Sequence, residues 1–335
     1  MRKTFWNGVL PAITTPFNTD GSVDHAFLAK HVGIMMEAGS SGIVPLGSLG
    51  ETATLSFDEK KAVLQTVVKS VADFAKRTGR DSAATAPAAT APAAIAANVT
   101  AAVPTVIPGV AALSTAEAVA FAKMAKDVGC GGLMVLPPYV YTSDWREMKH
   151  HVSQVIPATD LPCMLYNNPI AYKPDFFPPQ VAELAGEYAN LVAIKESSAD
   201  IRRIAAIKSL IGARLHILVG VDDLIVEGIA AGATGWVAGL VNAYPRESIV
   251  LFEMALAGKW KELEPLYHWF LPLLKLDTIP KFVQLIKLTQ AHAGLGSAAV
   301  RAPRMELAGA ELAEAENIIR HANLTKPATK PHFPS

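Results

Sequence analysis

The feature that most constrains the fold is a regular alternation of short apolar runs with longer amphipathic segments. Runs rich in Val, Ile and Leu are typical of strands buried on both faces, and a segment with helical spacing follows each one. Strands that alternate with helices form parallel sheets, and eight such units most often close into a (β/α)8 barrel. The strands are predicted at 8–15, 42–46, 105–110, 132–136, 162–166, 191–195, 215–219 and 235–239.

The main alternative for such a pattern is an open doubly wound sheet. That fold usually carries a glycine-rich dinucleotide-binding fingerprint after its first strand, and residues 8–24 contain none. We therefore predict an α/β chain with a (β/α)8 TIM barrel over residues 1–242. Its helices are predicted at 24–38, 57–76, 115–128, 145–155, 179–186, 201–211 and 223–231, with Ser56 and Glu59 as a capping box before the second.

Two stretches depart from this regularity. Residues 81–102 contain Ala-Thr-Ala-Pro-Ala-Ala twice, which indicates a low-complexity surface insertion without chemistry of its own. After residue 243 the strand signals stop, and the pattern predicts a C-terminal helical domain over 243–323. The polar tail 324–335 favours a frayed end. The helices of the C-terminal domain are predicted at 245–257, 260–274, 279–293 and 311–321.

The composition argues against several classes of protein. The 335 residues are 51% hydrophobic, and a formal net charge of zero argues against broad attraction to nucleic acid or to an anionic membrane. No secretory signal is visible, and the uncharged span 82–116 contains four prolines, which makes it a poor transmembrane helix. Cys130 and Cys163 lack disulfide or metal-ligand spacing and are expected to be buried. These features predict a soluble cytoplasmic protein.

A lysine stands at the end of one predicted strand. Residues 191–198 read Leu-Val-Ala-Ile-Lys-Glu-Ser-Ser, an apolar run that delivers Lys195 where it ends. Burial disfavours the charged form of a lysine, and a neutral amine is a nucleophile that can form a Schiff base with a carbonyl compound. The alternative is that Lys195 begins a solvated loop and pairs with Glu196.

Other strand ends present groups that could share a site with this lysine, because the active site of a TIM barrel forms at the carboxyl ends of its strands. Tyr166 ends the preceding strand, so that an amine and a phenol would face one mouth. The small-residue loop 47–50 exposes backbone N–H groups that suit a carboxylate. The other strand ends present Glu51, Tyr139, Tyr141, Asn167, Asn168, Gly220, Asp222, Asp223, Gly239 and Asn242.

Several of these residues also have structural explanations. Tyr166 could be an ordinary strand-end aromatic residue, and the loop 47–50 a tight turn. Glu51 is expected to cap the segment that follows it, and Asp222 is a plausible N-cap of the next helix. The nine histidines show no clustered spacing, so no metal site is predicted.

These motifs resemble the dihydrodipicolinate synthase / N-acetylneuraminate lyase family of class I aldolases. The resemblance extends from residue 8 to residue 321, interrupted by the insertion. Its signatures are Gly-Ser-x-Gly-Glu at 47–51, Tyr-Asn-x-Pro at 166–169 and Ile-Lys-Glu-Ser at 194–197, together with the helical C-terminal domain. Each motif is short, but their order and spacing on successive strands make the joint signal strong.

The resemblance implies a homotetrameric enzyme with no metal or organic cofactor. It implies an imine between Lys195 and a 2-oxo acid, often pyruvate, with Tyr166 moving a proton. Ser48 and neighbouring backbone N–H groups would hold the substrate carboxylate. The predicted catalytic residues are therefore Lys195, Tyr166 and Ser48. The predicted substrate-binding residues are Gly47, Ser48, Leu49, Tyr139, Ala171, Gly220 and Gly239.

The chain also departs from the family pattern. Leu49 stands where pyruvate-using members usually have a second hydroxyl residue. Ala171 stands where the synthase carries an arginine for its second substrate, so a bidentate, charge-assisted contact is missing. Val140 stands where the synthase lends a tyrosine across its dimer interface, with Tyr141 one residue further on. These departures argue against lysine-pathway synthase activity. They favour a dehydratase or deaminase acting on sugar-derived 2-oxo acids or hydroxyproline-derived pyrroline carboxylates.

We therefore expect a lyase that acts on a small-molecule 2-oxo acid by aldol cleavage or condensation, dehydration or deamination. The alternatives are 4-hydroxy-tetrahydrodipicolinate synthase itself and a non-catalytic protein that binds 2-oxo acids. A binding protein need not keep Lys195, Tyr166 and Ser48 together. A third hypothesis is a nicotinamide-dependent oxidoreductase. The sequence argues against it, because the chain lacks the glycine fingerprint of such enzymes.

Overall fold

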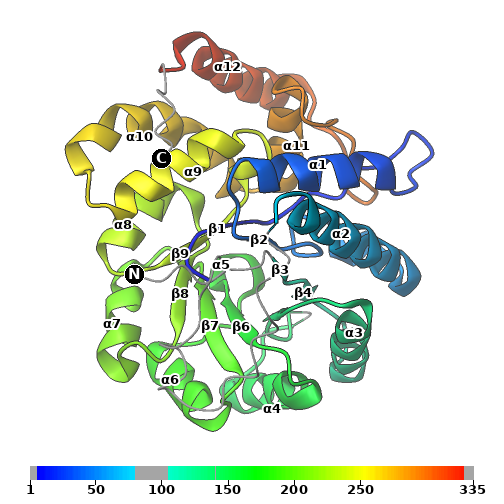
Figure 1. Ribbon diagram of the computed structural model, residues 1–335, viewed down its shortest axis with the longest axis vertical. Coiled ribbons are helices and arrows are strands. Elements are labelled where there is room, and N and C mark those ends of the chain that lie inside the picture. Colours follow the sequence, from blue (N-terminus) through cyan, green and yellow to red (C-terminus); the bar gives the residue numbers. More distant parts are fainter. Residues whose placement is uncertain (1–5, 80–104, 140, 328–335) are drawn as a thin grey trace.

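A ring of parallel strands forms the centre of the structure (Figure 1). The computed structural model describes residues 6–79, 105–139 and 141–327, so that the insertion 81–102 and tail residues 328–335 lie outside the described residues. The strands are β1 (Val9–Pro11), β2 (Gly42–Ile43), β3 (Thr105–Val106), β4 (Gly109–Val110), β5 (Leu133–Val135), β6 (Cys163–Asn167), β7 (Leu191–Glu196), β8 (His216–Val219) and β9 (Gly235–Ala238).

The strands close into the predicted (β/α)8 barrel. Seven of them form one parallel sheet in the order β1-β9-β8-β7-β6-β5-β4, and β2 pairs in parallel with β3. A bridge between Ala12 and Val44 joins the segments of β1 and β2. Since β3 leads directly into β4, the ring is complete.

One predicted strand differs in detail. The sequence predicts a single strand over 105–110, whereas the structure divides it into β3 and β4. The Ile107 N–H donates to the Ile43 carbonyl at 2.9 Å, and the Pro108 carbonyl accepts from the Met134 N–H at 2.9 Å. The segment therefore bonds to β2 on one side and to β5 on the other, and Pro108 has no N–H with which to extend either ladder.

Helices surround the barrel, and their limits agree closely with those predicted (Figure 1). The capping box of Ser56 and Glu59 is confirmed. The short helix α5 was not predicted; Asn168 caps it by accepting a hydrogen bond from the Ala171 N–H at 3.0 Å. The barrel helices are α1 (His25–Glu37), α2 (Phe57–Arg77), α3 (Thr115–Val128), α4 (Trp145–Val155), α5 (Pro169–Tyr172), α6 (Pro178–Glu187), α7 (Arg202–Ile211) and α8 (Ile225–Ala230).

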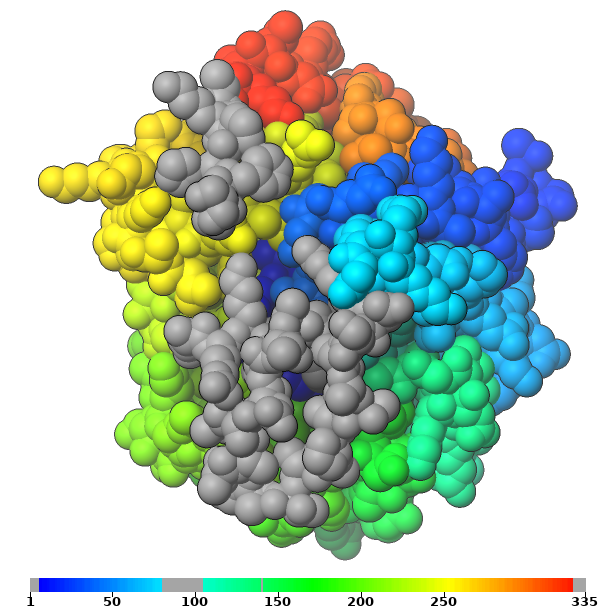
Figure 2. Space-filling view, viewed as in Figure 1, coloured from blue at the N-terminus to red at the C-terminus, as the bar shows by residue number. Residues whose placement is uncertain are grey.

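In the described part of the chain, four helices follow the last strand. In the space-filling view they extend from yellow to red beside the blue N-terminal helices (Figure 2). None of the helices in the described ranges has the length and apolar character needed to cross a membrane. The four are α9 (Pro245–Leu256), α10 (Trp260–Leu274), α11 (Phe282–His292) and α12 (Gly309–Thr325), and the 3-10 turn η6 (Lys275–Asp277) connects α10 to α11.

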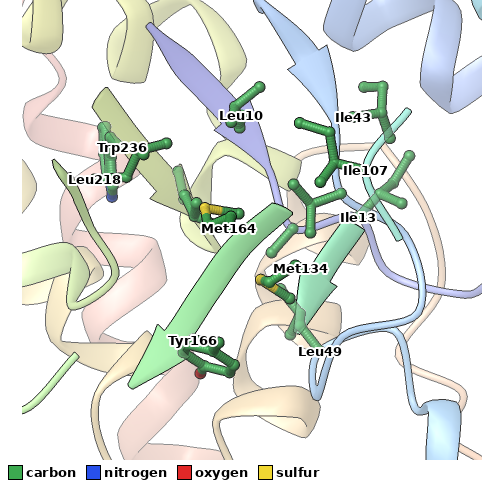
Figure 3. Packing of buried hydrophobic residues seen from close by; sticks show 14 of the residues in the cluster. Leu10, Ile13, Ile43, Leu49, Ile107, Met134, Met164, Tyr166, Leu218 and Trp236 are labelled. Atoms are coloured by element: carbon green, nitrogen blue, oxygen red, sulfur yellow. The ribbon is translucent and has the colours of Figure 1, made fainter. Parts of the chain in front are cut away.

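The interior of the barrel is a packed hydrophobic core. Leu10, Met134, Met164 and Trp236 come from four different strands and meet in it (Figure 3). Each of these residues is at most 1% exposed. Because side chains fill the interior, the barrel is a scaffold rather than a pore, and polar groups gather at the ends of its strands.

A buried ion pair joins the barrel to the C-terminal helices. Glu51, in the loop after β2, is fully buried, and one carboxylate oxygen accepts from Lys287 of α11 at 2.6 Å. The other oxygen accepts from the backbone N–H of Arg301 at 3.0 Å. Glu51 holds the predicted N-cap position, before the 3-10 turn η1 (Thr52–Thr54). Its side chain makes no capping hydrogen bond, because both of its oxygens are used in these contacts.

A second set of buried polar contacts joins the same parts of the molecule. The Thr14 hydroxyl, just after β1, donates to Gln290 Oε1 of α11 at 2.9 Å. Gln290 Nε2 of the same helix lies 3.2 Å from a ring nitrogen of His31 in α1, and that nitrogen lies 3.0 Å from Asn242 Oδ1, after β9. Burial lowers the pKa of His31 to about 4, so that the ring is neutral at physiological pH. Helix α11 is therefore fixed against the carboxyl ends of the strands at several points.

We expect Glu51→Gln to lower the free energy of unfolding by about 3–5 kcal/mol, because it leaves the Lys287 ammonium buried without its counter-charge. Denaturant unfolding followed by circular dichroism measures the change. The double variant Glu51→Gln/Lys287→Met removes both charges and should recover much of the loss. A double variant less stable than Glu51→Gln alone would contradict this account.

Candidate active site

Lys195 lies at the carboxyl end of β7. The register of the sheet pairs it with Tyr166 of β6, and only 7% of the residue is exposed. The alternative of a solvated loop is therefore wrong. Glu196 is also engaged elsewhere: its carboxylate accepts from the Ser198 backbone N–H at 2.7 Å and from the Asn167 amide at 3.2 Å.

Gly220, after β8, packs directly against the Lys195 side chain. A Cβ at this position would lie 2.4 Å from Lys195 Cε, 2.7 Å from its Cγ and 2.1 Å from Ser197 Oγ. Contacts this short do not occur in folded proteins, so any side chain at position 220 would have to displace the Lys195 and Ser197 side chains. Gly220, expected from the sequence to bind substrate, thus forms the wall against which the lysine lies.

The Tyr166 ring faces the lysine amine. Lys195 Nζ lies 4.2 Å from the ring centroid, and the phenol oxygen accepts a hydrogen bond from Asn168 Nδ2 at 2.9 Å. Burial raises the pKa of Tyr166 to about 12, against the lowering effect of the Asn168 hydrogen bond. The phenol therefore keeps its proton at neutral pH, as a group that delivers a proton beside the amine must.

Two further tyrosines continue the wall that begins at Tyr166. Tyr172, the last residue of α5, lies edge-on to Tyr166 with ring centroids 5.9 Å apart, and Tyr139 lies 5.5 Å from Tyr172. The Tyr172 hydroxyl shares a hydrogen bond with the Ser48 hydroxyl. Tyr172 was not identified from the sequence as a site residue, because the helix α5 that carries it was not predicted. The available signal was the dipeptide Asn168-Pro169, since Asn caps a helix and Pro begins one.

The loop 47–50 brings Ser48 to this mouth of the barrel. Gly50 is needed for close packing, because a Cβ there would lie 2.9 Å from the Leu46 backbone nitrogen. Leu46 itself is left-handed, with φ 59°. No described residue accepts a hydrogen bond from the backbone N–H of Ser48 or Leu49. Both N–H groups are thus available to an anion.

The other residues expected around the substrate differ in what they offer. Leu49 is 3% exposed and lies in the hydrophobic core near Met134, so that its side chain supplies no polar group (Figure 3). Gly47 also lies near Met134, whose terminal carbon would be 3.5 Å from a Cβ at position 47. Ala171 is exposed on α5 and offers no charge. Ser48 is therefore the polar side chain of this loop that reaches the mouth.

The pKa of the Lys195 amine differs from that of an ordinary lysine. Burial lowers the pKa of Lys195 to about 8, against the raising effects of Asp277 and Asp222. None of the described residues forms an ion pair with its Nζ. At pH 7 roughly one Lys195 side chain in ten is then a neutral amine, against fewer than about one in a thousand for an ordinary lysine.

Asp222, after β8, is buried and fully hydrogen-bonded. Its carboxylate accepts from Trp236 Nε1 at 2.8 Å, from the Leu240 N–H at 2.7 Å and from the Gly239 N–H at 3.1 Å. Burial raises its pKa to about 6 against these hydrogen bonds. The prediction that Asp222 caps its own helix is wrong: Val221 holds the N-cap position of η4 (Asp222–Leu224), and the carboxylate binds the turn after β9.

Asp277 brings a second carboxyl group to the site from the C-terminal helices. It ends η6, and its Oδ1 is buried without a hydrogen-bond partner among the described residues. A Cβ at Gly239 would lie 2.1 Å from that oxygen. Gly239 thus lies against Asp277, and its own N–H binds Asp222. Asp277 was not singled out from the sequence, because the contact joins residues far apart in the chain.

The arrangement has the features of a TIM-barrel enzyme whose nucleophile is an amine. A lysine with a depressed pKa faces a protonated phenol, and a hydroxyl with free backbone N–H groups lies at the same mouth. Within the described ranges no group of three or more His, Cys, Asp or Glu residues is placed to hold a metal ion. Cys130 and Cys163 are both buried and unpaired, as predicted.

Comparison with known proteins shows to which family of TIM-barrel enzymes this chain belongs. The model of the dihydrodipicolinate synthetase family matches residues 6–108 and 91–322. The chain therefore belongs to the dihydrodipicolinate synthetase family and is a lyase, as the resemblance in its motifs implied.

Relatives of known name cover most of the chain. The 4-hydroxy-tetrahydrodipicolinate synthase of Methanothrix thermoacetophila is 32% identical over 298 residues, which make up 88% of this chain and 88% of that protein. The enzyme of the same name from Methanococcus maripaludis strain C6 is 29% identical over 319 residues, 95% of this chain and 99% of its own. Among solved structures, dihydrodipicolinate synthase from Aquifex aeolicus is 26% identical with a TM-score of 0.82, and the alignment covers 95% of this chain and 98% of that one.

We expect the reactivity of Lys195 to rise with pH and to level off above about pH 8, because the ammonium form is unreactive and burial lowers its pKa to about 8. Competition labelling with a small acylating reagent, followed by peptide mass analysis at each pH, measures this titration. A midpoint near 10.4, the value of an ordinary lysine, would show that the amine is solvated.

Gly220→Ala should reduce the rate of reaction at Lys195 at least tenfold, because the added methyl group occupies the space of the lysine side chain. The overpacking should also lower the free energy of unfolding by about 1–3 kcal/mol. Gly186→Ala is the matched control, since a Cβ at this exposed position of α6 meets no atom within 4 Å. Equal labelling rates in both variants would argue against the packing role of Gly220.

Proposed function

We propose that this protein is a lyase that forms an imine between Lys195 and a 2-oxo acid. The observation that carries the proposal is the pairing of a buried amine, without an ion-pair partner among the described residues, with a phenol whose ring centroid is 4.2 Å away. The pKa of about 8 for Lys195 and of about 12 for Tyr166 suits a nucleophile and a proton carrier, respectively.

In the proposed reaction, neutral Lys195 attacks the 2-oxo carbon, and water leaves to form an iminium ion. The iminium draws electrons from the neighbouring carbon, which permits aldol cleavage or condensation, or elimination of a hydroxyl or amino group. Tyr166 moves the proton to and from the substrate. Ser48 and the N–H groups of Ser48 and Leu49 hold the substrate carboxylate.

The remainder of the substrate is suggested by what the site lacks. Ala171 supplies no cation, and Leu49 supplies no second hydroxyl group. Val140 lies outside the described residues, and Tyr141 beside it is exposed. We therefore favour dehydration or deamination of a sugar-derived 2-oxo acid or a hydroxyproline-derived pyrroline carboxylate. Formation of 4-hydroxy-tetrahydrodipicolinate is the alternative, supported by the names of the relatives.

The proposal includes the assembly and the setting of the enzyme. A homotetramer, built as a dimer of dimers, is expected from the family resemblance. The cytoplasm is the expected location, because both cysteines are buried and unpaired, as suits a reducing compartment. No organic cofactor or metal is part of the proposed mechanism.

Borohydride trapping tests the proposal. The full chain is incubated with borohydride and, in turn, with pyruvate, 3-deoxy-2-oxo sugar acids and hydroxy-pyrroline carboxylates. Intact-mass and peptide analysis should then show a reduced adduct on Lys195, and the compound that traps fastest narrows the substrate class. Lys195→Ala should form no adduct and should lose turnover entirely, since no other group supplies the imine nitrogen.

A protein that only binds 2-oxo acids would behave differently. It would give no reduced adduct, and thermal stabilisation by the same compounds would persist in Lys195→Ala. Circular dichroism of the variant confirms that the fold survives the substitution. An adduct on another lysine, with Lys195 unmodified, would overturn the assignment of the nucleophile.

A further inference from the structure

Asp277 is a half-buried titratable residue at this mouth for which the proposed reaction has no use. It comes from η6, outside the barrel, and lies against the turn after β9, close enough to Lys195 and Asp222 for their charges to interact with its own. Its Oδ1 is buried and accepts no hydrogen bond from any described residue. A buried polar atom without a partner destabilises the fold, so that a role in function is the natural reason for its place.

The packing at Gly239 fixes where this group lies. A Cβ at position 239 would be 2.1 Å from Asp277 Oδ1, 2.4 Å from its Cγ and 2.5 Å from Oδ2. The whole carboxyl group is therefore in close contact with the turn after β9. The same turn binds the Asp222 carboxylate through the Gly239 and Leu240 N–H groups, so that two acidic groups share one short segment.

These two acidic groups differ in their surroundings. Asp222 accepts hydrogen bonds from three residues, which stabilise its ionised form. Asp277 Oδ1 has no such donor. Burial, together with the nearby Asp222 and Asp223, raises the pKa of Asp277 well above its usual value, and Lys195 opposes this shift only in part. No described residue donates a hydrogen bond to Asp277 Oδ1, so that the surroundings favour the acid form of this carboxyl group.

We propose that Asp277 is a catalytic acid of imine formation, which gives its proton to the carbinolamine hydroxyl that leaves from the carbon bonded to Lys195; the inference rests on the proposed function. The C–O bond breaks, and the oxygen departs as water with the proton of Asp277. The nitrogen lone pair forms the C=N bond. Asp277 becomes a carboxylate beside the new iminium cation, which balances its charge. Hydrolysis of the final imine reverses these steps.

Tyr166 and Asp277 can serve different proton transfers, because they lie on different sides of the site. The phenol oxygen of Tyr166 is held by Asn168, at the end of β6, whereas Asp277 approaches from the side of β9. Asp277 makes no ion pair with Lys195 in the described structure, which leaves its oxygen free for a group attached to the amine. The leaving hydroxyl and the substrate carbon that exchanges a proton can therefore be served by different residues.

The test compares rates of borohydride-trapped adduct formation, using the compound that traps fastest on the full wild-type chain. Asp277→Asn should slow adduct formation about 100-fold or more, the usual contribution of a general acid. The substitution is nearly isosteric, so that the fold should be kept. Glu262→Gln, an exposed carboxylate of α10, is the control and should trap at the wild-type rate.

Chemical rescue separates an acid from a purely structural residue. Asp277→Ala removes the carboxyl group and leaves a space beside Gly239 that formate can enter. Formate should raise the trapping rate of Asp277→Ala at least tenfold, whereas chloride at the same ionic strength should not. Wild-type trapping rates in Asp277→Asn, or a slow Asp277→Ala that formate does not rescue, would overturn the inference while leaving the imine mechanism intact. No adduct on the wild-type protein would overturn both.

Discussion

The desolvation of one amine is the constraint on which the site depends. A shift in the pKa of Lys195 from 10.5 to about 8 corresponds to about 3 kcal/mol against the ammonium form in the folded protein. Because the unfolded chain keeps the ordinary pKa, this cost to stability is fully present below pH 8 and disappears as the pH rises through 10.5. The barrel core must supply that energy. The benefit is a lysine that is partly neutral at the pH at which the rest of the protein is stable.

The C-terminal helices complete this environment rather than merely follow the barrel. Glu51, directly after the loop that carries Ser48, is held by Lys287 of α11. The same group of helices supplies Asp277, which acts on the pKa of Lys195. An ion pair buried this deeply is weak as a source of net stability but strongly opposes any separation of its partners. The position of the loop 47–50 and the electrostatics of the amine therefore depend on the same interface.

Much of the fold and part of the site follow from local sequence. Apolar runs and helical spacing predict the barrel, and the ends of α3, α4 and α10 agree with the pattern. Lys195 and Tyr166 can be placed together because parallel strands end at one edge. Asp277 and Tyr172 could not be found in this way. Asp277 depends on a contact with Gly239 across the chain, and Tyr172 is carried by a four-residue helix too short to show a period. The same limit explains Glu51 and Asp222, whose partners are distant in sequence.

Two of the three glycines expected from the sequence to bind substrate show how such a site is assembled. Gly220 leaves space for the Lys195 side chain, and Gly239 leaves space for the Asp277 carboxyl group. In each case the residue at the strand end contributes by lacking a side chain, so that a longer titratable side chain from another element reaches the mouth. The site therefore depends both on the titratable side chains and on the glycines that leave space for them. Since the space at Gly239 admits a group from outside the barrel, a change in the C-terminal helices can alter the carboxyl group at the site without any change in the strands that carry Lys195 and Tyr166.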